Sequence, residues 1–588
     1  MPDDPIPEWF EDHPRWLDQE LQAIKAAGFD LHLDDQARAE GRIVLSGKVG
    51  AGRRRVPIRL EYPGGFPYFK PDNFGPPHLL GRHQNPYSGE LCVWPSGEQE
   101  WDWREPAAGA RLLQNALDLI RISAANPSSL RDEEERFPDP RNLYYPYHKG
   151  THILIPSTMS GLPNGAYGQV TILGPAPRFP MRGIAKRLRV DAPHSDLIQA
   201  PAPWSQLFPG AGEIVGHWVK VPEPPPFFQS EDQFHRSIAE WIAQQHPHTE
   251  EVLRWSEKEF GWHGTRVRLL GAIFPDEKRW GGAPEDHWLF VLEWQETDPS
   301  QGKVVKTLLY RTEFHDESVR LERSPSLRGL AHANVALFGL GALGSTIAAS
   351  LARAGVRHFL LLDHDRVELG NLVRHEADIG HLGLFKTDAM AQMLRRINPD
   401  VLITIVRGSF GMSRYSHNDL RHALKDFSLV ISAFADDAAN LVLNDLAGKL
   451  RIPQIYCWLG NGAWCGEVLR VIPGETACFE CFCYRASDSE SVEAQLRPTE
   501  SSEPLIRPAN CTSPTFTGTS FDIATLANAA SRMAAQTLLR GTGDGYPDAP
   551  YHYANWQFRL ADSSSLPSTE FATITPVDRC STCHGGRW

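Results

Sequence analysis

The chain has 588 residues, of which 41% are hydrophobic and 22% charged, and its formal net charge is −13. This length exceeds what one hydrophobic core supports, so we expect about two to four globular domains. The acidic balance argues against a surface that binds nucleic acid. Neither a membrane-length apolar run nor a signal peptide is present, so we expect a cytoplasmic protein with no membrane partner.

The N-terminal part alternates helix and strand signals. Residues 14–27 predict an amphipathic helix, and residues 42–49 and 55–61 alternate apolar and polar side chains like paired strands. A proline- and glycine-rich stretch follows, then His83-Gln-Asn85, and Cys92 comes seven residues after Asn85. A further helix is predicted over residues 107–124.

This order of elements resembles the ubiquitin-conjugating fold over roughly residues 10–130. The resemblance implies that Cys92 carries a protein modifier as a thioester. It also implies that His83 and Asn85 correspond to the family's His-Pro-Asn segment, whose proline is missing here, with the Asn85 amide supporting an oxyanion. Without the flanking pattern, a cysteine between two apolar residues is more often an inert buried thiol. The flanking pattern favours the catalytic interpretation of Cys92.

The middle of the chain carries no recognisable chemistry. A charged, proline-bearing stretch at about residues 130–150 predicts a domain boundary. Beyond it we expect one helix over residues 231–245 and strands over 267–274, 287–294 and 305–310. These elements predict a small α/β or β-rich domain that spaces and orients its neighbours.

A nucleotide-binding pattern begins with the apolar run 335–338. It continues through Gly339, Gly341 and Gly344 into an alanine-rich helix, and a second apolar run ends at Asp363. Strand, glycine loop, helix, strand and acid is the order of a nucleotide-binding βαβ unit, in which the carboxylate accepts ribose hydroxyls. By itself this pattern fits a dinucleotide oxidoreductase equally well.

The residues after Asp363 change that interpretation. Asp365, then Asn371-Leu-Val-Arg374, then Lys386 follow in order. They resemble the adenylating domain shared by ubiquitin-activating enzymes and bacterial enzymes that activate sulfur-carrier proteins. The resemblance implies ATP as the nucleotide. Two cations beside the phosphates suit adenylation, because a carboxylate attacking the α-phosphate builds negative charge that Arg374 and Lys386 would stabilise.

Two further residues take their roles from the same resemblance. Residues 429–434 predict a buried strand, and Asp436 at its end is expected to associate with Mg²⁺. Arg323, upstream of the first strand, is expected to reach the ATP of a second subunit, which implies a homodimer. An arginine in a loop is otherwise more often simply solvated.

Nine cysteines, thinly spread except near the C-terminus, favour metal binding or catalysis over a disulfide framework. Two CxxC pairs supply four thiolates and predict a structural Zn²⁺ site: Cys478, Cys481, Cys580 and Cys583. Cys483 is left out of this ligand set.

A further cysteine, Cys511, precedes a predicted helix over residues 521–539, after a polar stretch typical of a mobile loop. The resemblance implies that Cys511 takes over the adenylated carboxylate, and a helix N-terminus would favour its thiolate. A structural role for Cys511 is the alternative. Cys457 and Cys465 lie in apolar strand sequence and are predicted to be core residues.

These observations predict a multidomain α/β protein. We expect an α+β ubiquitin-conjugating-like domain (1–150), a small middle domain (151–318) and a Rossmann-like adenylating domain with a mostly parallel sheet (319–588). The combination resembles the activating–conjugating fusion proteins of CBASS antiphage operons. That resemblance implies a modifier with a free C-terminus, such as a cGAS-like nucleotidyltransferase, and an amine on a target as acceptor.

Three other functions stay open on the sequence. The first is a sulfur-carrier adenylyltransferase whose appended domain is not catalytic, so that Cys92 is structural. The second is a nucleotide-bound scaffold that makes no bond. A dinucleotide oxidoreductase fits least well.

Overall fold

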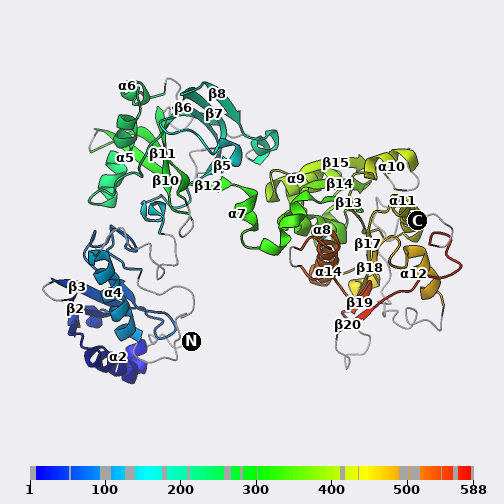
Figure 1. Ribbon diagram of the computed structural model, residues 1–588, viewed down its shortest axis with the longest axis horizontal. Helices are drawn as coiled ribbons and strands as arrows, with labels where there is room; N and C mark the ends of the chain where they lie inside the picture. The colour runs from blue at the N-terminus through cyan, green and yellow to red at the C-terminus, as the bar shows by residue number, and fades with distance from the viewer. Residues whose placement is uncertain are drawn as a thin grey trace. The chain divides into compact units, whose positions relative to one another are not determined.

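The structure is a computed structural model (Figure 1). It describes residues 8–51, 54–92, 108–125, 139–174, 182–207, 212–256, 266–278, 283–300, 302–408, 410, 417–434, 436–488, 501, 517–543, 546–559 and 567–583. The chain forms two compact units. The first comprises Met1–Ala200 with Gly210–Phe314, and the second comprises Pro201–Pro209 with His315–Trp588.

The N-terminal part of the first unit packs helices on a four-stranded antiparallel sheet of order β1-β2-β3-β4. Ile24 of one helix and Leu112 of another meet Leu45 and Leu60 of the sheet in one core. The predicted helices and strands are present. The elements are α1 (Trp9–Asp12), α2 (Pro14–Ala26), β1 (Leu31–Leu33), α3 (Asp35–Ala39), β2 (Ile43–Ala51), β3 (Arg54–Tyr62), β4 (Asp72–Phe74) and α4 (Ala108–Ala125).

The rest of the first unit is a closed barrel. Seven strands follow one another in the order β5-β12-β11-β10-β9-β6-β7, and β7 pairs with β5 to close the ring, while β8 extends from β7. The predicted helix and three strands are confirmed. The elements are β5 (His152–Pro156), β6 (Tyr167–Leu173), β7 (Arg182–Ala192), β8 (Asp196–Gln199), β9 (Glu213–Lys220), α5 (Glu231–Gln245), α6 (Thr249–Val252), β10 (Val267–Asp276), β11 (Glu285–Asp298) and β12 (Gly302–His315).

Around β10 and β11 both faces of the barrel wall are apolar, which explains why these two strands contain long hydrophobic runs. Leu269 and Trp288 lie in the interior cluster, to which all seven strands contribute. Their neighbours Leu270 and Leu289 lie in an outer cluster together with Phe234 of α5. Successive strand residues point to opposite faces, so one set fills the barrel and the other is covered by the helix.

The second unit is a doubly wound α/β domain. Its sheet has the order β15-β14-β13-β16-β17-β18-β19-β20, with parallel pairing from β15 to β17 and antiparallel pairing beyond. The elements are η3 (Ala202–Leu207), α7 (Glu317–Leu321), η4 (Pro325–His332), β13 (Asn334–Phe338), α8 (Ala342–Arg353), β14 (His358–Asp363), η5 (Leu369–Asn371), η6 (Ile379–His381), α9 (Lys386–Ile397), β15 (Leu402–Arg407), α10 (His417–Leu424), β16 (Leu429–Ser432), α11 (Asp437–Lys449), β17 (Gln454–Leu459), η7 (Asn461–Ala463), β18 (Cys465–Val471), α12 (Phe479–Ala486), α14 (Ser520–Leu538), β19 (Tyr553–Gln557) and β20 (Ser568–Ala572).

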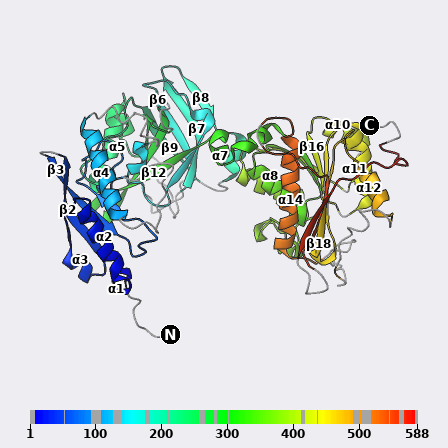
Figure 2. The same ribbon diagram turned by 60° about the horizontal axis from the view of Figure 1, so that its bottom comes forward.

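Helices cover both faces of this sheet. In Figure 2, α8 and α14 lie on one side of it and α10 to α12 on the other. Leu337 and Leu361 pack in the cluster that contains α8, α9 and α14. Their neighbours Phe338 and Leu362 pack in the cluster of α10 and α11. Two covered faces are typical of parallel sheets, and they leave the carboxyl ends of the strands as the place for a ligand.

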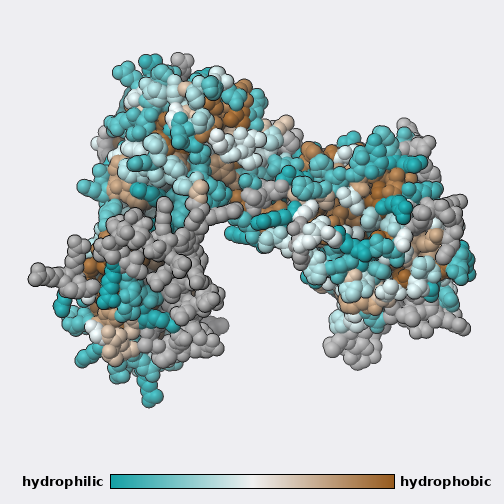
Figure 3. Space-filling view, in the orientation of Figure 1, coloured by the Kyte–Doolittle hydropathy of each residue, from teal (hydrophilic) through white to brown (hydrophobic). Residues whose placement is uncertain are grey.

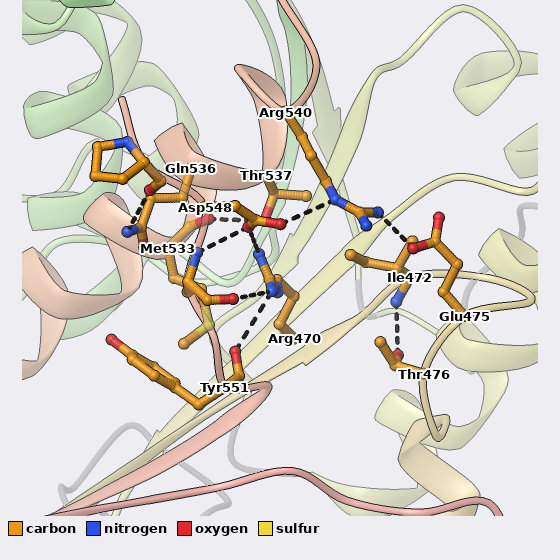
Figure 4. Close-up of polar contacts among 12 residues, drawn as sticks. Arg470, Ile472, Glu475, Thr476, Met533, Gln536, Thr537, Arg540, Asp548 and Tyr551 are labelled. Atoms are coloured by element: carbon orange, nitrogen blue, oxygen red, sulfur yellow. Dashed lines mark hydrogen bonds and ion pairs between the residues drawn. The ribbon is translucent and has the colours of Figure 1, made fainter. Parts of the chain in front are cut away.

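A buried arginine joins β18 to the segment after α14 (Figure 4). The Arg470 guanidinium, on a side chain that is 1% exposed, lies 2.5 Å from Asp548 Oδ1 and donates to the carbonyls of Ala549 and Tyr551. Arg540, whose side chain is 40% exposed, contacts the other oxygen of Asp548 at 3.0 Å and also contacts Glu475. One carboxylate therefore has a buried and an exposed arginine as partners.

In the part of the chain that the structure describes, no helix combines the length and the apolar composition needed to cross a bilayer. The face shown in Figure 3 is mostly hydrophilic, with scattered hydrophobic patches.

The two arginines predict different stabilities. Arg470→Gln should lower the free energy of unfolding of the second unit by about 3–5 kcal/mol, because it strands the buried carbonyls and breaks the buried pair. Arg540→Gln, the matched control on the same carboxylate, should cost about 1 kcal/mol or less, because water screens the exposed pair. Urea unfolding of the full chain measures both. Equal losses of unfolding free energy in the two variants would contradict the larger contribution expected of the buried arginine.

Candidate functional site

The glycine loop between β13 and α8 lies where the strand order of the second sheet reverses, between β13 and β16. Gly339 has φ +86°, and a Cβ on Gly344 would lie 1.9 Å from the Gly339 carbonyl oxygen, so neither position accepts a side chain without rearrangement. A Cβ on Gly341 would meet no atom within 4 Å. The loop therefore leaves open space beside the N-terminus of α8, which fits the phosphates of ATP.

Asp363 fixes this loop from the end of β14. Its Oδ2 accepts the backbone N–H of Leu340 at 2.6 Å, and its Oδ1 accepts the N–H of Asp365 at 2.8 Å. The residue is 6% exposed. A carboxylate has about four acceptor positions, so the two amide bonds leave acceptor capacity for ribose hydroxyls, as the sequence predicts.

Asp365 holds the candidate catalytic lysine. Lys386 Nζ lies 2.9 Å from Asp365 Oδ2, and the Lys386 backbone N–H donates to the Asp365 carbonyl, also at 2.9 Å. Lys386 is the first residue of α9, and its side chain is 11% exposed. His364 lies 3.2 Å from the other oxygen of Asp365. Asp363, His364 and Asp365 also bring their ligand atoms within 4.8 Å of one another, a spacing that could hold a cation.

His375 is a site residue that the sequence reasoning missed. Its Nε2–H donates to the Leu340 carbonyl at 2.8 Å, and its Nδ1 accepts the Ala377 N–H at 2.8 Å. These two bonds require the neutral imidazole, since a protonated Nδ1 would face another donor. Burial lowers the pKa of His375 to about 4, with nearby Lys386 acting in the same direction. The sequence feature that could have pointed to His375 is its position directly after Arg374.

Asn371 and Arg374 occupy the turn that follows. Asn371 Oδ1 accepts the Glu368 N–H at 3.0 Å, so the amide caps its own turn. Arg374 is half-buried, and burial lowers the pKa of its guanidinium.

The two remaining predicted nucleotide residues lie at the surface. Asp436 is exposed, and its Oδ1 accepts the Ala439 N–H at 2.9 Å as the N-cap of α11. Arg323 is exposed just beyond α7.

The four predicted zinc cysteines come together between α12 and the C-terminal segment. Their sulfur–sulfur distances are 3.9 Å (Cys478–Cys481), 3.4 Å (Cys478–Cys580) and 3.6 Å (Cys481–Cys583). A tetrahedral ion with Zn–S bonds of about 2.3 Å has edges of about 3.8 Å, so this donor set fits structural Zn²⁺. The backbone N–H groups of Val577 and Cys583 also point at sulfur atoms of the set.

The other cysteines separate by environment. Cys457 and Cys465 are 1% exposed, which confirms them as core residues, and burial raises the pKa of Cys457 to about 12. Cys483 lies outside the four-sulfur group, and burial raises its pKa to about 12 as well. Cys511, the predicted activating cysteine, lies outside the described residues.

Cys92 is exposed and follows a short paired loop. Its N–H donates to the His83 carbonyl at 2.8 Å, and the N–H of Asn85 donates to the Glu90 carbonyl, also at 2.8 Å. Asn85 Oδ1 accepts the N–H groups of Tyr87 and Ser88 at 2.9 and 3.1 Å. The structure thus brings His83 and Asn85 onto the loop that carries Cys92. The side-chain amide oxygen of Asn85 stabilises the turn of this loop.

The sequence profile of the ThiF family matches residues 316–575, which cover the second sheet, the glycine loop and two of the four clustered cysteines, Cys478 and Cys481. Residues 316–575 form a ThiF-type adenylating domain. The profile begins at the second residue of the second unit's main segment.

Known proteins resemble the chain to different extents. The protein y4oA of Sinorhizobium fredii is 24% identical over 614 residues, 97% of both chains. The ubiquitin-like modifier-activating enzyme 5 of Arabidopsis thaliana is 33% identical over 159 residues, 25% of this chain and 37% of the relative. A crystal structure of E. coli MccB with AMPCPP and MccA is 17% identical, covers 45% of this chain and 74% of that one, and has a TM-score of 0.34.

The four cysteines predict metal-dependent stability of the ThiF-type domain. The purified protein should contain about one zinc per chain, and Cys478→Ser should lose it together with much of the domain's stability, since structural zinc contributes folding free energy. Cys483→Ser is the matched control, from the helix whose N-cap is Cys478, and should keep the metal. Elemental analysis and thermal unfolding give the readouts. Zinc retained in Cys478→Ser would contradict the assignment.

His375 predicts a pH-dependent stability. In the unfolded chain a histidine takes up its proton near pH 6.5, but in the fold His375 stays neutral to about pH 4. Proton uptake by the unfolded chain therefore favours unfolding between these two pH values. The free energy of unfolding falls by up to about 3 kcal/mol as the pH falls from 6.5 to 4. His375→Gln should flatten this part of the urea-unfolding profile. A profile with the wild-type slope would refute the prediction.

Proposed function

We propose that this protein uses ATP to activate the C-terminal carboxylate of a protein modifier and passes the acyl group through Cys511 and Cys92 to an amine of a target. The observation that carries the first step is the joint arrangement of the Gly339–Gly341 loop, Asp363 and the Asp365–Lys386 pair at the carboxyl ends of a ThiF-type sheet. The similarity to modifier-activating enzymes supports the same step.

In the proposed activation, the modifier's carboxylate oxygen attacks the α-phosphorus of ATP. A bond to phosphorus forms, the bridge to the β-phosphate breaks and pyrophosphate leaves. Lys386, held by Asp365, and Arg374 would stabilise the charge that develops, while Asp363 and Asn371 would orient the nucleotide. Mg²⁺ associated with Asp436, whose Oδ1 caps α11, would neutralise phosphate charge. Arg323, exposed near the start of the domain, would reach the ATP of a second copy in a homodimer.

The later steps use the two cysteines in turn. The Cys511 thiolate attacks the acyl-adenylate and AMP leaves; the Cys92 thiolate then attacks the thioester and the Cys511 thiolate leaves. A target amine attacks last, Cys92 leaves as thiolate and the amine loses its proton to solvent. Division into covalent steps lowers each barrier. Exposure of Cys92 beside His83 and Asn85 supports its part in this relay.

For the modifier we propose a protein with a free C-terminus of the kind that activating–conjugating fusions use, such as a cGAS-like nucleotidyltransferase in antiphage defence. A sulfur-carrier adenylyltransferase with a non-catalytic first unit, or a nucleotide-bound scaffold, would use the same second unit differently.

Adenylation is tested first. Lys386→Ala should lower ATP–pyrophosphate exchange by at least about 100-fold, because it removes a cation from the reacting phosphates. Lys449→Ala is the matched control, since Lys449 pairs with Asp445 on the exposed face of α11. ATP binding without pyrophosphate exchange in the wild type would instead support the scaffold.

The relay is tested by intact-protein mass spectrometry with ATP, Mg²⁺ and candidate modifiers. Wild type should form a reductant-sensitive adduct that Cys511→Ala loses and that stays on Cys511 in Cys92→Ala. Conjugation that survives Cys92→Ala would reject the two-cysteine relay.

A further inference from the structure

The position of Cys92 depends on His83. The Cys92 N–H donates to the His83 carbonyl. The neighbouring residues Gln84 and Leu91 form an isolated antiparallel bridge between the same two segments. Whatever fixes the backbone of His83 therefore fixes the cysteine.

His83 adopts a backbone conformation that needs support. Its φ of +56° is in the left-handed region, which costs a residue other than glycine on the order of 1–3 kcal/mol and persists only where surrounding contacts hold it. A carboxylate supplies one such contact: Asp139 Oδ2 accepts the His83 N–H at 2.7 Å.

Asp139 is itself held on all sides. It is 8% exposed, and its second oxygen accepts the Tyr144 hydroxyl at 2.5 Å. The Asp139 N–H donates to Glu277 Oε2 at 3.4 Å, and that oxygen also pairs with Arg82 at 2.8 Å. Glu277 directly follows β10 of the barrel.

The segment that carries Asp139 is anchored to the same end of β10. Both carboxylate oxygens of Asp276 accept backbone N–H groups at 2.9 Å, one from Arg141 and one from Asn142. The Asp276 carboxylate is itself mostly buried, and burial raises its pKa, which these backbone bonds counteract. The anchor for Asp139 is thus a strand end of the barrel.

A second tether joins the loop to the barrel's outer cluster. The ring of Tyr87, two residues after Asn85, lies 6.0 Å from the ring of Phe227, edge to face. The guanidinium carbon of Arg141 lies over the Phe227 ring, 4.4 Å from its centroid. The Cys92 loop is therefore attached to the barrel through backbone, ion-pair and aromatic contacts at three successive points.

We propose that Asp139 is a positioning residue for Cys92, through which the barrel holds the cysteine loop in the conformation that acyl transfer requires. This inference rests on the proposed function. On this inference the barrel positions the reacting cysteine and does not only space its neighbours. Such positioning affects the rate, because misplacement of a reacting group by about 1 Å can slow a reaction by about 100-fold. Burial raises the pKa of Tyr144 most, and the Asp139 carboxylate and then the Cys92 thiol raise it further.

The test compares two replacements of one side chain in the full-length protein. Asp139→Asn keeps an oxygen that can accept the His83 N–H, whereas Asp139→Leu has a similar size and no acceptor. In Asp139→Leu, acyl transfer from Cys511 to Cys92 in single turnovers should slow by at least about tenfold, with thioester formation on Cys511 unchanged. Backbone hydrogen exchange of residues 83–92 should accelerate by a similar factor. Asp139→Asn should stay close to the wild type in both readouts.

The outcomes separate this inference from the proposed function. Wild-type exchange and transfer in Asp139→Leu would overturn the inference, as would equal damage in Asp139→Asn. If the wild type forms no thioester on Cys92, the relay fails, and exchange in residues 83–92 alone decides whether Asp139 holds the loop. If Asp139→Leu does not fold, Glu277→Gln replaces it. That variant weakens the same tether and should slow transfer, and unchanged transfer would overturn the inference.

Discussion

One carboxylate links the parts of the candidate adenylation site. Asp363 accepts the backbone N–H groups of Leu340 and Asp365, so a single side chain at the end of β14 sets the glycine loop on one side and the lysine-holding acid on the other. His375 reaches the same loop from the following turn through the Leu340 carbonyl. Leu340 thus has both backbone polar groups held by side chains, which pre-organises the loop before any nucleotide binds.

In the second unit, the candidate nucleotide loop lies in the parallel part of the sheet, and the cysteine cluster and the buried ion pair lie in the antiparallel part. The nucleotide loop lies among the parallel strands, where two covered faces leave only the strand ends accessible. The four cysteines lie together where α12 meets the C-terminal segment beyond β20, and Asn444 of α11 contacts both Phe479 and Thr582. Arg470 and Asp548 fasten the antiparallel part near α14. Hydrogen bonds and a buried ion pair therefore stabilise the antiparallel extension in addition to packing.

The first unit combines a small α+β sheet with a barrel, and the contacts between them gather on the Cys92 loop. Arg82, His83 and Tyr87 each contact a residue of the barrel or of the segment leading into it. A left-handed histidine backbone held by a buried aspartate is the kind of local strain that persists only when its surroundings determine it. His83 lies nine residues before the exposed Cys92, and its carbonyl accepts the Cys92 N–H.

The sequence by itself determined many of the local elements of both units. Periodicity gave helices α2, α4, α5 and α14 and the strands of the βαβ unit, and the glycine spacing and the CxxC pairs predicted the nucleotide loop and the sulfur cluster, because these depend on short-range geometry. Tertiary structure alone decided the barrel closure, the neutral tautomer of His375 and the contact between Asp139 and His83. Each depends on pairing between segments distant in sequence, such as β5 with β7 or His83 with Asp139. No local pattern encodes such a pairing, since a buried polar group finds its partner only when the chain has folded.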